Sequence, residues 1–298
     1  MTAQRRAEIF LLLLTVIWGS TFVIVKSVLA ENSPLWYTAF RWILSALLLG
    51  LVFFRRIRKI SGTTLVRGSI LGVLLYVGFV LQTVGLQTTT ASKAAFMTGM
   101  LVVFTPIVHY ISQHFLHLGK KSLKIGNLFG VACAAAGLYL MTSPAGSEFV
   151  VGDGQTLIAA FLFACYIVYL DYVSDEPDKM QLAFVQFGVC ALLAVAFAAG
   201  LEELKVALTR EFFAALMYLT VFATIIAMAV QIRYQGDTTP TRAAVIFSLE
   251  PVLAGIFAYY VRGEIIGTLG VIGGAIIIVG LLLSEFSDEI PILDKSIT

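Results

Sequence analysis

Runs of apolar residues, each about as long as a bilayer-spanning helix, occupy almost the whole chain. A transmembrane α-helix needs about 20 predominantly apolar residues to cross the hydrocarbon core. The connections are short, so they leave no room for a separate soluble domain. The pattern therefore predicts an all-α membrane protein with ten transmembrane helices. These are expected near residues 8–30, 34–54, 66–88, 92–115, 123–142, 154–173, 180–200, 212–234, 240–261 and 265–284.

The composition indicates that lipid, not water, is the solvent. Of 298 residues, 59% are hydrophobic and only 13% are charged, whereas soluble domains average roughly 25% charged residues. The net charge is +2 and no basic run indicates a nucleic-acid partner. Cys133, Cys165 and Cys190 lie inside apolar runs without a C-x-x-C pair, so neither a disulfide framework nor a zinc site is indicated. We expect no metal and no cofactor.

Basic residues gather on alternate connections, and this bias predicts the orientation in the cell membrane. With the N-terminus in the cytoplasm, inner segments carry fourteen Lys or Arg residues and outer segments carry four, which satisfies the positive-inside rule. An even number of spans then returns the C-terminus to the cytoplasm. A signal-peptidase site after Ala30 is the alternative for the first run, and cleavage there would remove the first span. The inner residues are Arg5, Arg6, Arg55, Arg56, Arg58, Lys59, Arg67, Lys120, Lys121, Lys124, Lys179, Arg233, Arg242 and Lys295, and the outer ones are Lys93, Lys205, Arg210 and Arg262.

The second half of the chain repeats the first. Residues 90–95 (TASKAA) match residues 239–244 (TPTRAA) at an offset of 149. Later matches shift by about one helical turn, which preserves the helix face. We therefore divide the chain into residues 1–145 and 146–298, with five spans in each half. Because five is odd, the second half enters the membrane inverted, as in secondary transporters with a substrate site near the midplane. The later matches are Pro106 with Pro251 at 145, and Gly119, Gly126 and Gly130 with Gly263, Gly270 and Gly274 at 144.

Short motifs in a fixed order resemble the EamA-type carriers of the drug/metabolite transporter superfamily over nearly the whole chain. This resemblance implies ten helices around a central cavity and alternating access, often as a proton- or gradient-coupled exporter of amino acids or other metabolites. One departure is Gly119-Lys120, where that family commonly has Gly-Glu, and it argues against symmetrical acids at the two sites. The motifs are Trp18-Gly19-Ser20, Phe40-Arg41, Ala91-Ser92 before Pro106, Ser248-Leu249-Glu250-Pro251, and Gly263-Glu264 with Gly270, Gly274 and Gly280.

Glu250 is the first candidate site residue. It lies about eleven residues into the ninth expected span, so the rise per residue places it near the midplane. An acid at that depth costs several kcal/mol unless it is protonated, paired or hydrated. Pro251 removes a backbone donor next to it and loosens the helix. We interpret Glu250 as a proton carrier or a partner for a substrate amine; a buried acid that ties helices together is the alternative.

Other polar side chains inside apolar runs are weaker candidates. Arg41 could hold a carboxylate bidentately or anchor a helix end. Lys93 and Arg242 occupy equivalent positions in the two halves, where they could bind an anion, gate an entrance or face water. Trp18 either lines the cavity or packs beside Gly19. The remaining candidates are Tyr76, Gln82 and Tyr166, whose polar tips suit a cavity or interhelical hydrogen bonds.

These observations favour a secondary transporter of small molecules. No Walker A pattern appears, so ATP is not its direct fuel. An uncoupled facilitator on the same fold and, third, a membrane-embedded enzyme remain alternatives, although neither H-E-x-x-H nor G-x-S-x-G is present. A cavity with Arg41 and Glu250 suits a zwitterion, and protons are the candidate coupling ion. The glycine pairs at 126/130 and 270/274 predict close helix contacts within a monomer or a homodimer.

Overall fold

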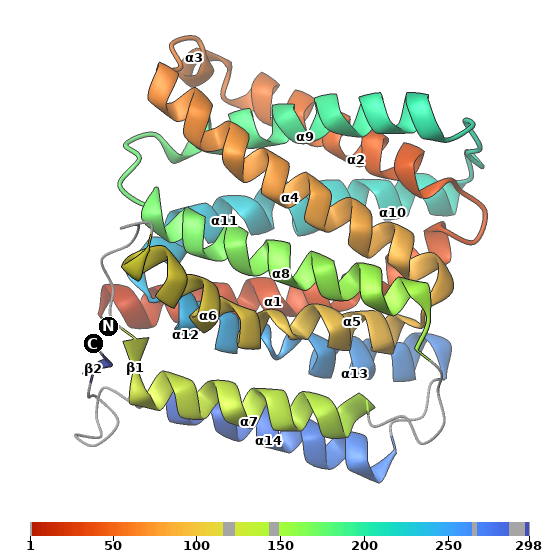
Figure 1. Cartoon of the computed structure of the whole chain (residues 1–298). Coiled ribbons are helices and arrows are strands. Elements are labelled where there is room, and N and C mark those ends of the chain that lie inside the picture. The colour runs from red at the N-terminus through yellow and green to blue at the C-terminus, as the bar shows by residue number, and fades with distance from the viewer. Residues whose placement is uncertain (1, 116–122, 143–148, 264–266, 286–295, 298) are drawn as a thin grey trace.

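The computed structural model describes most of the chain as a bundle of helices (Figure 1). The proposed boundary at residues 145/146 and the motif residues Gly119, Lys120 and Glu264 lie outside the described residues, as do Lys121 and Lys295. The described residues are 2–115, 123–142, 149–263, 267–285 and 296–297.

In the first half, polar caps start the helices where the sequence changes from polar to apolar. Ser61 accepts a hydrogen bond from the backbone N–H of Thr64, and Thr90 accepts one from Lys93. Such caps satisfy amide groups that have no partner within the helix. The helices are α1 (Ala3–Val28), α2 (Pro34–Val52), α3 (Phe54–Ile57), α4 (Gly62–Thr88), α5 (Ala91–Gly99), α6 (Leu101–His114) and α7 (Ile125–Thr142).

The second half follows the same rules, with two irregular helical turns. Asp178, Thr209 and Thr239 cap helices with their side chains, and Gly263 ends α13 with a left-handed φ of 67°. The elements are α8 (Val151–Tyr172), α9 (Lys179–Leu201), α10 (Arg210–Thr220), the π-helical turn η1 (Val221–Ile226), α11 (Ala227–Tyr234), the 3-10 turn η2 (Gln235–Asp237), α12 (Pro240–Phe247), α13 (Glu250–Arg262) and α14 (Thr268–Glu285). A two-residue strand β1 (Leu123–Lys124) pairs antiparallel with β2 (Ser296–Ile297).

The prediction of a multi-pass, all-helical membrane protein is confirmed. Eight helical segments of the described chain are long and apolar enough to cross a membrane. Two shorter apolar helices, residues 125–140 and 268–284, coincide with the fifth and tenth expected spans. Long segments such as α1 and α8 run along one common direction, and the two termini lie at the same end of the bundle (Figure 1).

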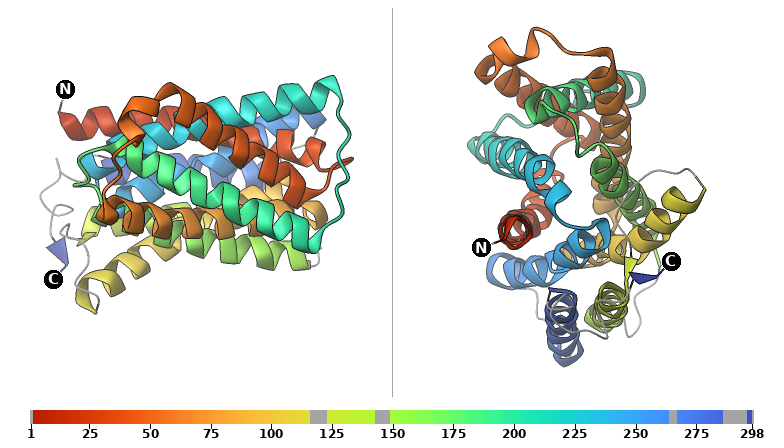
Figure 2. Two further views of the ribbon diagram at one scale, coloured as in Figure 1. Left: turned by 90° about the horizontal axis from the view of Figure 1, so that it is seen from above. Right: turned by 90° about the vertical axis from the view of Figure 1, so that its left-hand side faces the viewer.

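Helices from the two halves pack against each other throughout the bundle. Helix α4 lies against α8 and α9, α2 lies against α9, and α1 lies against α13. Helices α7 and α14 form a closely packed pair along one edge (Figure 2). Among the largest buried side chains, Trp42 of α2 and Phe187 of α9 pack against each other with ring centroids 5.6 Å apart.

Glycines let α7 and α14 approach closely, as predicted, but the participating set differs from the expected one. A Cβ atom at Gly130 would lie 2.9 Å from the carbonyl oxygen of Gly280, and one at Gly137 would clash with the carbonyl of Gly273. Gly274 instead faces Val252 of α13 at 3.6 Å. Gly130 and Gly137 are seven residues apart, about two helical turns, so they lie on the same face of α7 and both contact α14.

The close α7–α14 contact predicts different effects for two Gly→Ala substitutions. Gly137→Ala should lower the apparent melting temperature in detergent, because a backbone clash of this kind costs about 1–3 kcal/mol. Gly188→Ala is the matched control, since a Cβ at Gly188 meets nothing within 4 Å and alanine is the better helix former. A thermal-shift measurement in which both variants behave alike would contradict the contact.

Candidate functional site

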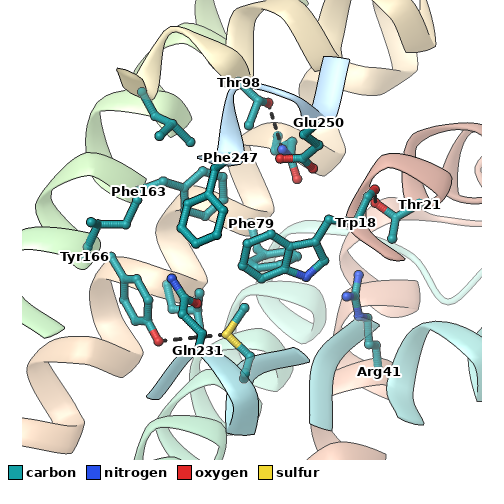
Figure 3. Close-up of a pocket in the computed structure, with 15 residues that line it drawn as sticks. Trp18, Thr21, Arg41, Phe79, Thr98, Phe163, Tyr166, Gln231, Phe247 and Glu250 are labelled. Atoms are coloured by element: carbon teal, nitrogen blue, oxygen red, sulfur yellow. Dashed lines mark hydrogen bonds between the residues drawn. The ribbon is translucent and has the colours of Figure 1, made fainter. Parts of the chain in front are cut away.

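An internal cavity lies where both halves of the chain meet (Figure 3). Five of the predicted site residues line it, namely Trp18, Arg41, Gln82, Tyr166 and Glu250. The sequence-based reasoning missed its aromatic wall of Phe79, Phe163 and Phe247, and the polar or sulfur-bearing Thr21, Thr98, Met228 and Gln231. Helical periodicity alone does not distinguish an aromatic that faces a cavity from one that faces lipid, although Gln231, a polar residue inside an apolar run, was a usable signal.

Glu250 enters the cavity from a break in a helix. Helix α12 ends at Phe247 and α13 begins at Glu250, so the ninth expected span is discontinuous. The Ser248 hydroxyl donates to the carbonyl of Val245 at the break (2.6 Å). Glu250 is only 7% exposed, and among the described residues no basic side chain is within ion-pair distance of its carboxyl group. The break therefore places a buried acid at the cavity wall, and none of the described basic side chains pairs with it.

Trp18 lies next to this break because α1 approaches α13 very closely. A Cβ atom at Gly19 would lie 2.6 Å from Leu253 Cβ and 3.3 Å from the Glu250 carbonyl oxygen. The indole Nε1 of Trp18 donates to the carbonyl of Ala223 at 3.1 Å. Trp18 thus lines the cavity, and its neighbour Gly19 permits the close contact of α1 with α13.

Arg41 contributes a buried cation to the same cavity. Arg41 is only 4% exposed, and its Nε donates a hydrogen bond to Thr224 Oγ1 at 2.7 Å. Its guanidinium carbon lies 5.0 Å from the centroid of the Phe79 ring, a cation–π distance. Thr224 belongs to the π-helical turn η1, and its hydroxyl donates to the carbonyl of Leu219 at 2.9 Å. Turns of this type occur frequently at functional sites.

Neutral hydrogen bonds complete the cavity wall. Gln82 Nε2 donates to Thr98 Oγ1 at 2.8 Å, which joins α4 to α5. The Tyr166 hydroxyl donates to Gln186 Oε1 at 3.3 Å. In Figure 3, Glu250 lies above the Trp18 ring, near Thr98, and Arg41 lies to the lower right of that ring. The cavity thus contains one basic and one acidic side chain together with aromatic surface.

Three predicted site residues lie elsewhere. Tyr76 is buried against Phe197, with ring centroids 5.8 Å apart. Lys93 Nζ pairs with Asp153 Oδ2 at 2.6 Å, and Arg242 Nη1 pairs with Glu8 Oε1 at 3.2 Å. Helical position alone could not show that these cations have carboxylate partners on other helices.

The groups that line the cavity are suited to binding a small ligand. Arginine can donate two parallel hydrogen bonds to a carboxylate, an unpaired carboxylate can accept from an amine, and aromatic rings cover apolar surface. No group of three His, Cys, Asp or Glu side chains that could hold a metal occurs among the described residues. A mainly apolar cavity with a few polar and charged groups, enclosed by a multi-pass helical bundle, suits a membrane protein that binds and moves a small molecule.

The chain belongs to the EamA-like transporter family. The family model matches residues 5–143 and, a second time, residues 150–286. The family and the names of the relatives point to a transporter and not to an enzyme. The resemblance found in the sequence is confirmed.

Two curated relatives and one solved structure extend this comparison. An uncharacterized transporter of Archaeoglobus fulgidus is 30% identical over 277 residues, covering 93% of this chain and 85% of the relative. A probable amino-acid metabolite efflux pump of Escherichia coli is 27% identical over 303 residues, covering 95% and 96%. One crystal structure has a TM-score of 0.75 at 16% identity and covers 94% of this chain and 96% of that one, which shows a common fold.

The contact between Arg41 and Thr224 predicts a difference between two substitutions. Thr224→Val keeps the side-chain volume and removes the acceptor, so it should destabilise the protein by about 1.5–3 kcal/mol, the value of a hydrogen bond to a charged group. Thr224→Ser keeps the hydroxyl and should cost much less. Thermal unfolding in detergent measures both, and equal stabilities would show that Arg41 does not depend on this contact.

Proposed function

We propose that this protein is a secondary transporter that exports small zwitterionic metabolites such as amino acids by alternating access. The observation that carries the proposal is that a buried cation, Arg41, and a buried acid, Glu250, line the same aromatic cavity. A zwitterion presents a carboxylate to the first and an ammonium group to the second. It would thereby satisfy two charges that are expensive to leave alone inside a membrane.

The proposed architecture is ten transmembrane helices arranged as two inverted repeats of five. The helix neighbours support it, because most contacts occur in related pairs. In the proposed repeat, α4 corresponds to α10 and α11, and α8 corresponds to α1. The contact of α4 with α8 therefore has its counterpart in the contact of α1 with α10 and α11. The contacts of α2 with α9 and of α7 with α14 each join two helices that correspond to one another. Helix breaks at Met100 and at Ser248–Leu249, in the fourth and ninth spans, support it further.

We also propose the cell membrane as the location, with both termini in the cytoplasm. The support is the excess of Lys and Arg on one set of connections, together with the position of both termini at one end of the bundle (Figure 1). In this orientation the loop before Pro34 and the loop after Leu201 face the outside; they are joined by the hydrogen bond from the Ser33 N–H to the Lys205 carbonyl (2.9 Å).

Protons are the coupling ion in this proposal, and Glu250 is the residue that binds them. A buried carboxylate with no cation beside it favours either a proton or a substrate ammonium. Because the two occupants compete for one group, the proton can be carried in one direction and the substrate in the other. An uncoupled facilitator would not need Glu250 to change its protonation state.

Glu250→Gln should abolish gradient-driven transport in proteoliposomes. The glutamine keeps the size of the side chain but cannot exchange a proton, so imposing a pH gradient should no longer accelerate movement of amino acids detected by mass spectrometry. Glu203→Gln, which removes an exposed acid in the loop after α9, is the matched control and should transport normally. Gradient-independent movement in the wild type and in both variants would identify an uncoupled facilitator.

Arg41→Lys should weaken amino-acid transport selectively. Lysine keeps the charge but loses the bidentate geometry, so the KM for an amino acid should rise about tenfold, which corresponds to about 1.4 kcal/mol. The KM for the matching amine without a carboxylate should hardly change. Arg233→Lys, at a half-exposed arginine that pairs with Asp237, serves as the control. An equal rise in KM for the amino acid and the amine would contradict carboxylate binding at Arg41.

A further inference from the structure

Two ion pairs connect helices at opposite ends of the bundle, outside the cavity lining. At one end, Lys93 in the first turn of α5 pairs with Asp153 in the first turn of α8, with 2.6 Å between Nζ and Oδ2. The second carboxylate oxygen of Asp153 accepts from the hydroxyl of Thr89, also at 2.6 Å. The Asp153 side chain is fully buried and that of Lys93 is 17% exposed. This end therefore holds a charged, hydrogen-bonded contact between two helices.

The other end has the same construction. Arg242 in the first turn of α12 pairs with Glu8 in α1, with 3.2 Å between Nη1 and Oε1, and both side chains are at most 5% exposed. The hydroxyl of Thr238 donates to the same Glu8 oxygen at 3.3 Å. Arg242 also donates to the carbonyl of Ser284 in α14. Helices α5 and α8 begin at one end of the bundle, whereas α1 and α12 begin at the other (Figure 1).

The two contacts are related by the proposed repeat. Thr89 and Lys93 correspond to Thr238 and Arg242 at the offset of 149 residues, and Glu8 corresponds to Asp153 at 145. A threonine, a cation and a carboxylate thus recur in the same roles in two halves whose sequences differ at most positions. The repeat therefore places one contact of this kind at each end of the bundle.

Each ion pair joins two helices that line the cavity. Helix α5 carries Thr98 and α8 carries Tyr166, while α12 carries Phe247 and α1 carries Trp18. Separating the two helices of either pair therefore opens the cavity wall toward the end where that pair lies. From this geometry we propose that the Lys93–Asp153 and Arg242–Glu8 pairs are the two gates of the transporter, one for each side of the membrane.

Buried ion pairs suit this role for an energetic reason. Desolvation offsets much of the attraction between two buried charges, so the closed pair is close in free energy to a separated pair that both partners hydrate. A half-broken state, with one charge buried alone, is strongly unfavourable. Each gate is therefore an element with two favourable states, which is the property that alternating access requires.

The gates can be tested by the accessibility of a cysteine in the cavity. The reporter is Thr21→Cys, with Thr98→Cys as a second one, in a protein whose Cys133, Cys165 and Cys190 are replaced by alanine. A membrane-impermeant maleimide is applied to right-side-out and to inside-out vesicles. A cysteine at Glu203, in the loop at the end where α5 and α8 begin, identifies that face.

Neutralising either carboxylate should open one end. Asp153→Asn should raise the labelling rate from the face where α5 and α8 begin by about fivefold or more, and Glu8→Gln should do so from the opposite face. The charge-exchanged variant Lys93→Asp/Asp153→Lys should return labelling toward the rate of the parent and also controls for folding. Asp175→Asn removes an exposed ion pair with Arg67 and should leave both rates unchanged.

The inference rests on the proposed transport function, and the two can fail separately because labelling needs no substrate. Labelling that rises equally from both faces, stays unchanged, or is undetectable in both reporters would overturn the gates, even if the wild type transports amino acids. Side-specific increases in a protein that moves no amino acid in proteoliposomes would support the gates and contradict the proposed substrate.

Discussion

Backbone hydrogen bonding in lipid is the constraint on which this structure depends. In hydrocarbon, each unpaired amide or carbonyl costs several kcal/mol, so irregular backbone is tolerated only where protein or a cavity surrounds it. Three helix irregularities within the described spans obey this rule. The α5–α6 and α12–α13 breaks and the π-helical turn η1 all adjoin the cavity, where Thr98, Glu250 and Thr224 contribute side chains or contacts. The defects in regular helix and the functional groups therefore coincide.

The same constraint sorts the charges inside the membrane-embedded part. Lys93 and Arg242 have carboxylate partners on other helices, and each ion pair joins two helices at one end of the bundle. Arg41 has a hydroxyl acceptor and an aromatic face, and Glu250 has no cation beside it among the described residues. Charges that have carboxylate partners suit a structural or gating role, whereas Arg41 and Glu250 are the charges that the proposed function assigns to a ligand. This division is the physical basis for separating cavity from gates.

The aromatic wall gives the cavity its second property. Trp18, Phe79 and Phe247 present large, rigid surfaces whose burial is favourable without a fixed hydrogen-bond pattern. Trp18 lies 5.3 Å from Phe247 between ring centroids. Such a surface accepts apolar side chains of different shapes, and in the proposed function Arg41 and Glu250 would select the common backbone of a zwitterion.

The sequence by itself determined the helical membrane class, the family, the positions of the apolar runs and five of the residues that line the cavity. Those features are local, because hydropathy, caps and short motifs act within one helix or along one span. Only the tertiary structure decided that Lys93 meets Asp153, that Arg242 meets Glu8, and that Tyr76 turns away from the cavity. These contacts join residues far apart in the chain, and a helical period of 3.6 residues places a side chain on a face without stating what that face will meet.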